Sequence, residues 1–167
     1  MLIYHSTCLL LGGNIGDRFY FLECARAMIK QQVGEILEYS FVYETAAWGN
    51  EAQAAYLNQA LLVKTVYEPR VLLLIIQKIE KELGRVRNES VRWGARTIDI
   101  DILMYSDCVL SEPDLQIPHS MLGARRFMLV PMCDILGNWL HPIKKKYLFQ
   151  MLEDCEDNLL VKRVDIV

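Results

Sequence analysis

The chain has 167 residues, of which 53% are hydrophobic and 23% charged, and its formal net charge is −3. This length fits one domain with a single core, which we assign to residues 1–167, and the hydrophobic content is too high for a disordered chain. The acidic balance argues against a protein that coats nucleic acid, and no apolar stretch approaches the roughly 20 residues of a membrane span.

The N-terminal segment and the cysteines both indicate a cytoplasmic location. Residues 1–13 lack a basic start and a small-residue cleavage site, so we expect no signal peptide. Five cysteines are scattered without the spacing of a metal finger or a redox motif. Reduced thiols in a cytoplasmic protein are the simplest interpretation.

The first part of the chain predicts three strands and one helix. A buried strand over residues 6–13 ends in two glycines, and a helix follows over 17–32 with Asp17 as its N-cap. Branched and aromatic residues predict strands over 36–45 and 56–66, which a loop connects.

The second part predicts another helix, another strand and a helical extension. Pro69 fits the first turn of a helix and Gly84 the position after its end, which gives a helix over 68–84. A polar loop leads to a strand over 97–105, and one or more short helices follow. The order β-α-β-β-α-β predicts an α+β, ferredoxin-like fold, an antiparallel sheet with helices packed on one face, plus a C-terminal helical extension.

The predicted strand 97–105 carries two aspartates on one face. Asp99 and Asp101 alternate with Ile98, Ile100 and Ile102, so the isoleucines should face the core and the carboxylates a cleft or solvent. Adjacent carboxylates repel each other, and a magnesium ion between them would offset that repulsion. A solvated strand face is the alternative interpretation.

Arginines gather in the loop before this strand. Arg85, Arg87, Arg92 and Arg96 lie within twelve residues. A guanidinium group matches the oxygens of a phosphate, and such a cluster repels itself unless an anion joins it. Carboxylates that hold a metal, beside arginines that hold phosphates, are typical of phosphoryl-type transfer, and no P-loop motif is present.

With these motifs in view, the chain resembles the 6-hydroxymethyl-7,8-dihydropterin pyrophosphokinase family of folate biosynthesis. Its segment RWGARTIDIDIL resembles the family signature Arg-x-Gly-Pro-Arg-Thr-x-Asp-x-Asp, with Ala95 in place of proline. YETAAWG, YLNQAL, ELGRVR, IPHSM and RFMLVP occur in the family's order, and Ala47 stands where proline is frequent.

The resemblance implies an enzyme that transfers pyrophosphate from ATP to the hydroxymethyl oxygen of the pterin and releases AMP. It implies two Mg²⁺ ions held by Asp99 and Asp101, with Arg92 and Arg96 completing the catalytic set. It implies a nucleotide site, whose expected residues are Gln77, Arg85, Arg92, Arg96, His119 and Arg125. It also implies a pterin slot, whose expected residues are Thr45, Trp48, Tyr56, Asn58, Trp93 and Phe127.

The resemblance carries two further implications. Trp93 belongs to a loop that closes over the pocket, and Arg125, more than its neighbour Arg126, is the expected phosphate contact. The implied partners are the two small-molecule substrates, without nucleic acid or membrane, and a monomer is compatible with the sequence. Two alternatives are a metal-dependent nucleotidyl transferase or nuclease, and a ferredoxin-like module that binds a small ligand without chemistry.

Overall fold

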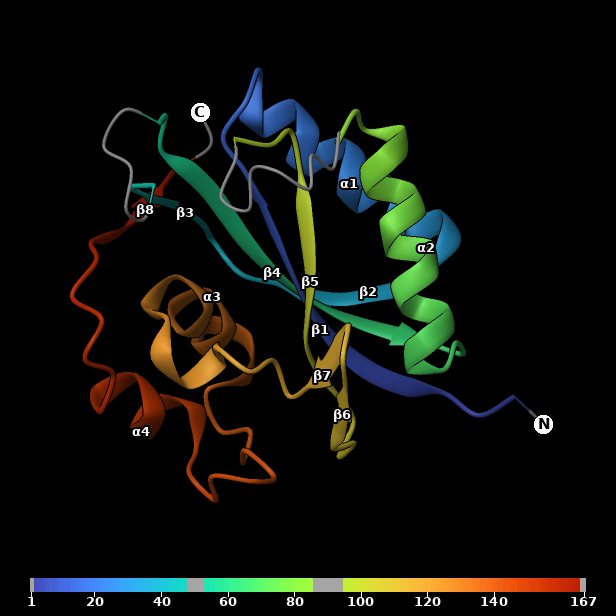
Figure 1. Ribbon diagram of the computed structural model, residues 1–167, viewed down its shortest axis with the longest axis vertical. Helices are drawn as coiled ribbons and strands as arrows, with labels where there is room; N and C mark the ends of the chain where they lie inside the picture. The colour runs from blue at the N-terminus through green and yellow to red at the C-terminus, as the bar shows by residue number, and fades with distance from the viewer. Residues whose placement is uncertain (1, 48–52, 86–94, 166–167) are drawn as a thin grey trace.

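The computed structural model describes residues 2–47, 53–85 and 95–165. A six-stranded antiparallel sheet forms its centre, with strand order β5-β1-β4-β3-β8 and with β2 also paired to β4 (Figure 1). The strands are β1 (His5–Gly13), β2 (Gly34–Tyr39), β3 (Val42–Thr45), β4 (Tyr56–Thr65), β5 (Asp99–Tyr105) and β8 (Val161–Val164). The predicted α+β, ferredoxin-like class is therefore confirmed.

Two helices, α1 (Arg18–Gln32) and α2 (Pro69–Glu82), cover one face of the sheet. The predicted signals at their ends are present. Asp17 accepts a hydrogen bond from the Tyr20 N–H over 3.0 Å, and Gly84 has a φ of 83°, which favours glycine.

The C-terminal helices cover part of the opposite face. These are α3 (Arg126–Leu136), which follows the short helix η1 (Leu122–Ala124), and α4 (Leu148–Glu153). Two cores result, where the sequence predicted a single one, because alternate side chains of a strand point to opposite sides of the sheet and helices cover both. In β1, Leu9 and Leu11 belong to the core under α1 and α2, whereas Cys8 and Leu10 belong to the core under α3 and α4.

Three local features depart from the sequence expectations. The predicted strand 36–45 is two strands, β2 and β3, which meet at Ser40. There the Ser40 N–H donates to Ala60 O and the Ser40 hydroxyl accepts from the Ala60 N–H, each over 2.9 Å, because the pairing with β4 shifts between the two strands. A small hairpin, β6 (Leu110–Glu112) and β7 (Leu115–Ile117), follows β5. The C-terminal tail ends in β8, which pairs with β3.

No helix in the described part of the chain is long and apolar enough to cross a membrane.

Candidate active site

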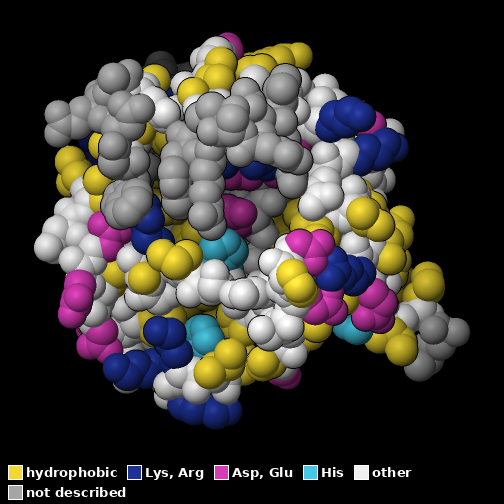
Figure 2. All heavy atoms as spheres, viewed as in Figure 1, with side chains coloured by type: hydrophobic (Ala, Val, Ile, Leu, Met, Phe, Trp, Pro, Cys, Tyr) yellow, Lys and Arg dark blue, Asp and Glu magenta, His cyan; other side chains and the backbone are white. Residues whose placement is uncertain are grey.

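The main pocket, of about 600 Å³, lies on the sheet face that α3 and α4 cover only in part. Figure 2 shows a hollow near the centre of this face, with acidic and histidine side chains at its floor. Strands β1, β3, β4 and β5 supply the floor, and the segment from His119 to Met128 supplies one side. The described residues that line it are Leu10, Gly12, Thr45, Ala46, Gln53, Tyr56, Asn58, Arg96, Asp99, Asp101, His119, Ser120, Met121, Arg125, Phe127, Met128 and Leu159.

Asp99 and Asp101 line this pocket from one face of β5. The alternating isoleucines Ile98, Ile100 and Ile102 are buried in the core under α1 and α2, so the predicted division of the strand into an apolar and an acidic face is confirmed. Asp99 is opposite Gly12 of β1 in the strand pairing. A Cβ atom on Gly12 would lie 3.0 Å from Asn58 Oδ1, so glycine keeps this part of the floor open.

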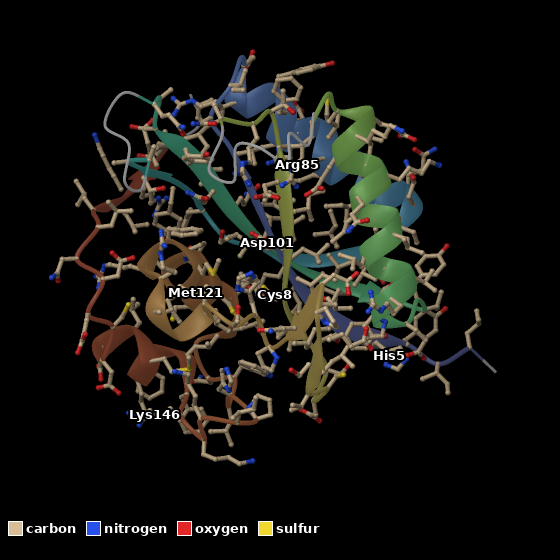
Figure 3. All side chains as sticks on the ribbon, in the orientation of Figure 1. His5, Cys8, Arg85, Asp101, Met121 and Lys146 are labelled. Carbon is tan, nitrogen blue, oxygen red and sulfur yellow. The ribbon has the colours of Figure 1, made fainter. Side chains whose placement is uncertain are left out.

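Two arginines bind the carboxylate of Asp99. Arg96 Nη1 is 2.6 Å from Asp99 Oδ2, and Arg85 Nη1 is 2.5 Å from Asp99 Oδ1. Arg85 also pairs with Glu80, and Figure 3 shows Arg85 beside β5, between the end of α2 and Asp101. Both oxygens of Asp99 thus have a cationic partner.

Glu80 is a buried carboxylate that the sequence prediction missed. Its side chain is 3% exposed, and Oε1 accepts a hydrogen bond from the Ile100 N–H over 2.8 Å. It therefore connects α2 to β5 and to Arg85. The sequence did carry one signal of this burial: Glu80 is four residues after the buried Ile76, and residues i and i+4 share a helix face.

Two of the acidic groups, Asp101 and Glu80, have raised pKa values. Burial, followed by the charges of Asp99 and Glu80, raises the pKa of Asp101 to about 8, although Arg85 and Arg96 oppose the shift. Burial and the charge of Asp99 likewise raise the pKa of Glu80. Further positive charge in the pocket would therefore favour the ionised carboxylates.

His119 approaches the pocket from the segment after β7. Its backbone N–H donates to Leu103 O over 2.9 Å, which fixes it against β5, and its Nδ1 accepts from the Met121 N–H over 3.2 Å. Burial lowers the pKa of His119, although the charge of Asp99 opposes the shift. In the neutral ring with Nδ1 as acceptor, the proton is on Nε2, which can donate to a ligand.

Arg125 and Phe127 stand at the start of α3. The Arg125 guanidinium carbon lies 5.1 Å from the centre of the Phe127 ring, within the range of a cation–π contact. The carboxylate of Asp157, from the C-terminal tail, lies 3.7 Å from Arg125 Nε.

The other end of the pocket has a polar and aromatic lining. Thr45, Tyr56 and Asn58 come from the paired ends of β3 and β4. The Asn58 amide group donates to the Thr45 hydroxyl over 2.9 Å, which leaves Oδ1 as the acceptor beside Gly12. Such a lining can read the edge of a flat polar ring.

The structure brings most of the predicted site residues into this one pocket. Gln77 and Arg85 are not among its lining residues, although Arg85 forms an ion pair with Asp99, which does line the pocket. Trp48, Arg87, Arg92 and Trp93 lie outside the described residues. Besides Glu80, sequence reasoning missed Gln53 and Leu159, which come from segments without a distinctive motif, and Met121, which lies in the IPHSM motif but was given no role.

The two aspartates fit a magnesium site that the substrate helps to complete. Within residues 2–47, 53–85 and 95–165, no three His, Cys, Asp or Glu side chains form a group that could hold a metal alone. Magnesium commonly takes one or two carboxylates and fills its remaining positions with water and phosphate oxygens. Burial and the charges of Asp99 and Glu80 raise the pKa of Asp101 to about 8, and a divalent cation beside it would favour the ionised carboxylate.

Comparisons with known proteins identify the family of this chain. A family model described as 7,8-dihydro-6-hydroxymethylpterin-pyrophosphokinase matches residues 8–137. A protein of Aquifex aeolicus with the name 2-amino-4-hydroxy-6-hydroxymethyldihydropteridine pyrophosphokinase is 44% identical over 138 residues, which cover 83% of this chain and 84% of the relative. The protein of that name from Bacillus subtilis is 42% identical over 126 residues, which cover 75% of this chain and 74% of the relative.

Solved structures support the fold. The crystal structure of Plasmodium falciparum HPPK-DHPS matches with a TM-score of 0.76 at 16% identity, over 91% of this chain. This chain spans 45% of that longer chain. The family-model match ends at residue 137, so α4, Asp157 and β8 lie beyond it.

Proposed function

The chain belongs to the family of 7,8-dihydro-6-hydroxymethylpterin-pyrophosphokinases, and we propose that the pocket on β1, β3, β4 and β5 is its active site. The enzyme transfers pyrophosphate from ATP to the hydroxymethyl group of 6-hydroxymethyl-7,8-dihydropterin in folate biosynthesis. Family membership does not favour the nuclease, nucleotidyl transferase or non-catalytic alternatives. The cytoplasmic location and the monomeric state stay predictions.

One observation supports this assignment most strongly. The same pocket contains two carboxylates from β5, basic side chains from two other segments, and a polar aromatic slot from β3 and β4. A polyphosphate with its metal ions needs the first two sets, and a flat heterocycle needs the third. Their proximity would bring the two substrates together in one place.

Two magnesium ions, held by Asp99 and Asp101, complete the proposed nucleotide site. When bound, such ions neutralise phosphate charge and make the phosphorus easier to attack. Arg96, His119 and Arg125 approach the pocket around the two aspartates and would hold the phosphate oxygens. Arg85 and Arg92 would add further contacts, and Gln77 would lie near the nucleoside.

The Asp99 ion pairs suggest how the free enzyme keeps these charges in place. In this structure Arg85 and Arg96 both form ion pairs with Asp99. On binding, the phosphates would take the guanidinium groups and the metal would take the carboxylate. Each charge would then exchange one partner for another, so no isolated charge is left buried in the pocket.

The pterin slot would hold its ring between aromatic side chains. Phe127 and Tyr56 are the aromatic residues of the described pocket lining, and Trp48 and Trp93 are proposed to join them. Asn58 Oδ1 is positioned to accept a hydrogen bond from the ring edge, because its amide nitrogen already donates to Thr45. Because Oδ1 is an acceptor, it would select a ring that has an N–H at that edge.

In the reaction, the hydroxymethyl oxygen attacks the β-phosphorus of ATP, and the bond between the α- and β-phosphates breaks to release AMP. The residues of this chain would contribute mainly by positioning the two substrates and by stabilising charge. Asp99 and Asp101 are also candidates to orient the attacking hydroxyl group. Exclusion of water from the pocket would protect the transferred group, for which water otherwise competes.

The test is to incubate the protein with ATP, magnesium and the hydroxymethyl pterin and to separate the nucleotides. We expect AMP only when the pterin is present, together with one pterin pyrophosphate for each AMP. Reactions without pterin and with EDTA are the controls. ADP as the product, or AMP formation that does not need pterin, would contradict the proposed reaction.

A further inference from the structure

The C-terminal tail runs along the pocket before it joins the sheet. After α4, exposed and partly buried residues alternate from Cys155 to Val161, as expected for an extended segment with one face against the protein. Asp157 and Leu159 are on the inward face. The tail then forms β8, in which Val161 pairs with Thr45 of β3.

Asp157 links this tail to the beginning of α3. Its Oδ2 accepts a hydrogen bond from the Arg126 N–H over 3.0 Å and lies 3.7 Å from Arg125 Nε. Its Oδ1 accepts from the Leu159 N–H over 3.1 Å. The side chains of Asp157 and Arg125 are 13% and 12% exposed, so water screens this ion pair only weakly.

Leu159 is the tail residue that reaches the pocket. Asp157 fixes its backbone, and Val161, two residues later, is in register with Thr45. Leu159 is therefore held close to the end of β3 that supplies the polar slot. Its neighbour Leu160 is 75% exposed and is not part of the pocket lining.

We propose that residues 156–164 form a wall of the active site, in which Asp157 is a positioning residue for Arg125 and Leu159 closes the pterin slot. This inference rests on the proposed roles of Arg125 and of the slot. Arg125 immediately precedes α3, and the Asp157 carboxylate accepts a hydrogen bond from the next backbone N–H and forms a 3.7 Å ion pair with Arg125 Nε. A guanidinium group held in this way has less conformational freedom to lose when it binds phosphate.

A purely structural role for Asp157 makes a different prediction. Asp157 satisfies a backbone N–H in the first turn of α3, and loss of such a contact lowers stability whatever the substrate. Asp157→Asn removes the charge but keeps the shape and one oxygen acceptor. Asp157→Ala removes the ion pair and the backbone contacts together.

The experiment compares Asp157→Asn with the wild type and with Asp154→Asn. Asp154 is in the same region, is 59% exposed and pairs with Lys146, so it controls for the loss of an acidic side chain. The dissociation constant of ATP with magnesium is measured by calorimetry, and KM and kcat are measured from AMP formation. We expect Asp157→Asn to weaken ATP binding and to raise the KM for ATP about fivefold, as for the loss of one charge-assisted contact. The change in kcat should be smaller.

A double-mutant cycle separates positioning from folding. In an Arg125→Ala background, Asp157→Asn should have no further effect on ATP affinity, because its action passes through Arg125. An equal loss of affinity in both backgrounds would show that Asp157 acts through the fold, and unchanged affinity in Asp157→Asn would also overturn the proposal. The calorimetric measurement of ATP binding does not depend on turnover. If the wild type bound ATP but formed no AMP, the proposed reaction would be wrong, yet the comparison of ATP affinities would still test the role of Asp157.

Leu159→Ser and Leu160→Ser test the wall itself. We expect Leu159→Ser to raise the KM for the pterin about fivefold, as for loss of apolar contact in a pocket, and to leave the KM for ATP nearly unchanged. Leu160→Ser should behave like the wild type. Equal pterin KM values for the two variants would refute the assignment of Leu159.

Discussion

Asn14 and Arg96 exchange hydrogen bonds in both directions: Arg96 N–H donates to Asn14 Oδ1 over 2.9 Å, and Asn14 N–H donates to Arg96 O over 2.9 Å. The Asn14 amide nitrogen also donates to Ala54 O over 3.1 Å. Asn14 is 5% exposed. It therefore joins the turn after β1 to Arg96, which precedes β5, and to Ala54, which precedes β4.

Asn14→Ala should impair both stability and activity. The backbone N–H of Arg96 would lose its acceptor, which costs about 1–3 kcal/mol for a buried group, and Arg96 would be less well positioned against Asp99. Thermal unfolding and kcat with both substrates check this, with the exposed Asn138→Ala as control. Wild-type values for both quantities in Asn14→Ala would show that these contacts are dispensable.

Asp99→Asn should remove activity while the fold survives. The side chain leaves the core and faces the pocket, so the apolar packing of β5 is unchanged. Loss of a charged ligand for metal and phosphate should lower kcat roughly 100-fold or more. AMP formation and circular dichroism measure the two effects, and the exposed Asp107→Asn is the matched control. Turnover within about threefold of the wild type would contradict the metal role.

Asp101 should make the metal-free protein less stable as pH rises. Burial and the charges of Asp99 and Glu80 raise the pKa of the folded Asp101 carboxyl to about 8, against about 4 in the unfolded chain. Between these values the folded state binds more protons than the unfolded state, so its stability falls with rising pH. The contribution is complete below pH ~4 and is lost by pH ~8.

Asp101→Asn tests this dependence. In EDTA at pH 8 the variant should melt several degrees above the wild type, because the amide removes the cost of ionising this buried carboxyl. At pH ~4 the difference should be small, since Asp101 is then protonated in the folded state and about half protonated in the unfolded chain. The variant should also be inactive. A constant difference in melting temperature at both pH values would rule out this titration as its cause.

His119→Gln should keep more ATP affinity than His119→Asn. Nδ1 of His119 accepts from the Met121 N–H, so the group available to a phosphate is Nε2–H. The amide nitrogen of glutamine can occupy the place of Nε2, whereas that of asparagine occupies the place of Nδ1. Calorimetric titration of each variant with ATP and magnesium gives the order, and a stronger affinity in His119→Asn would reverse the tautomer assigned here.

The sequence predicted the elements whose signals are local. The Asp17 cap, Pro69 and Gly84 mark the ends of α1 and α2, because a helix end must satisfy its backbone groups within a few residues. The alternation of isoleucine and aspartate in β5 likewise determined which side chains face the core. The family signature identified Asp99, Asp101 and Arg96 for the same reason, since its residues are adjacent in the chain.

The sequence did not predict relationships between distant segments. The tail 156–164 has a weak strand pattern, and its pairing with β3 depends on an open sheet edge that only the folded sheet provides. The same holds for the ion pairs of Asp99 with Arg85 and of Arg125 with Asp157.

The sequence by itself determined the class of fold, the acidic strand and the family, because each depends on residue types at fixed local spacing. Only the tertiary structure decided that α3 and α4 cover the second face of the sheet, that Glu80 supports Arg85, and that Asp157 faces Arg125. The physical reason is that such contacts depend on how separate elements pack, and a periodic pattern specifies the buried face of an element but not its partner.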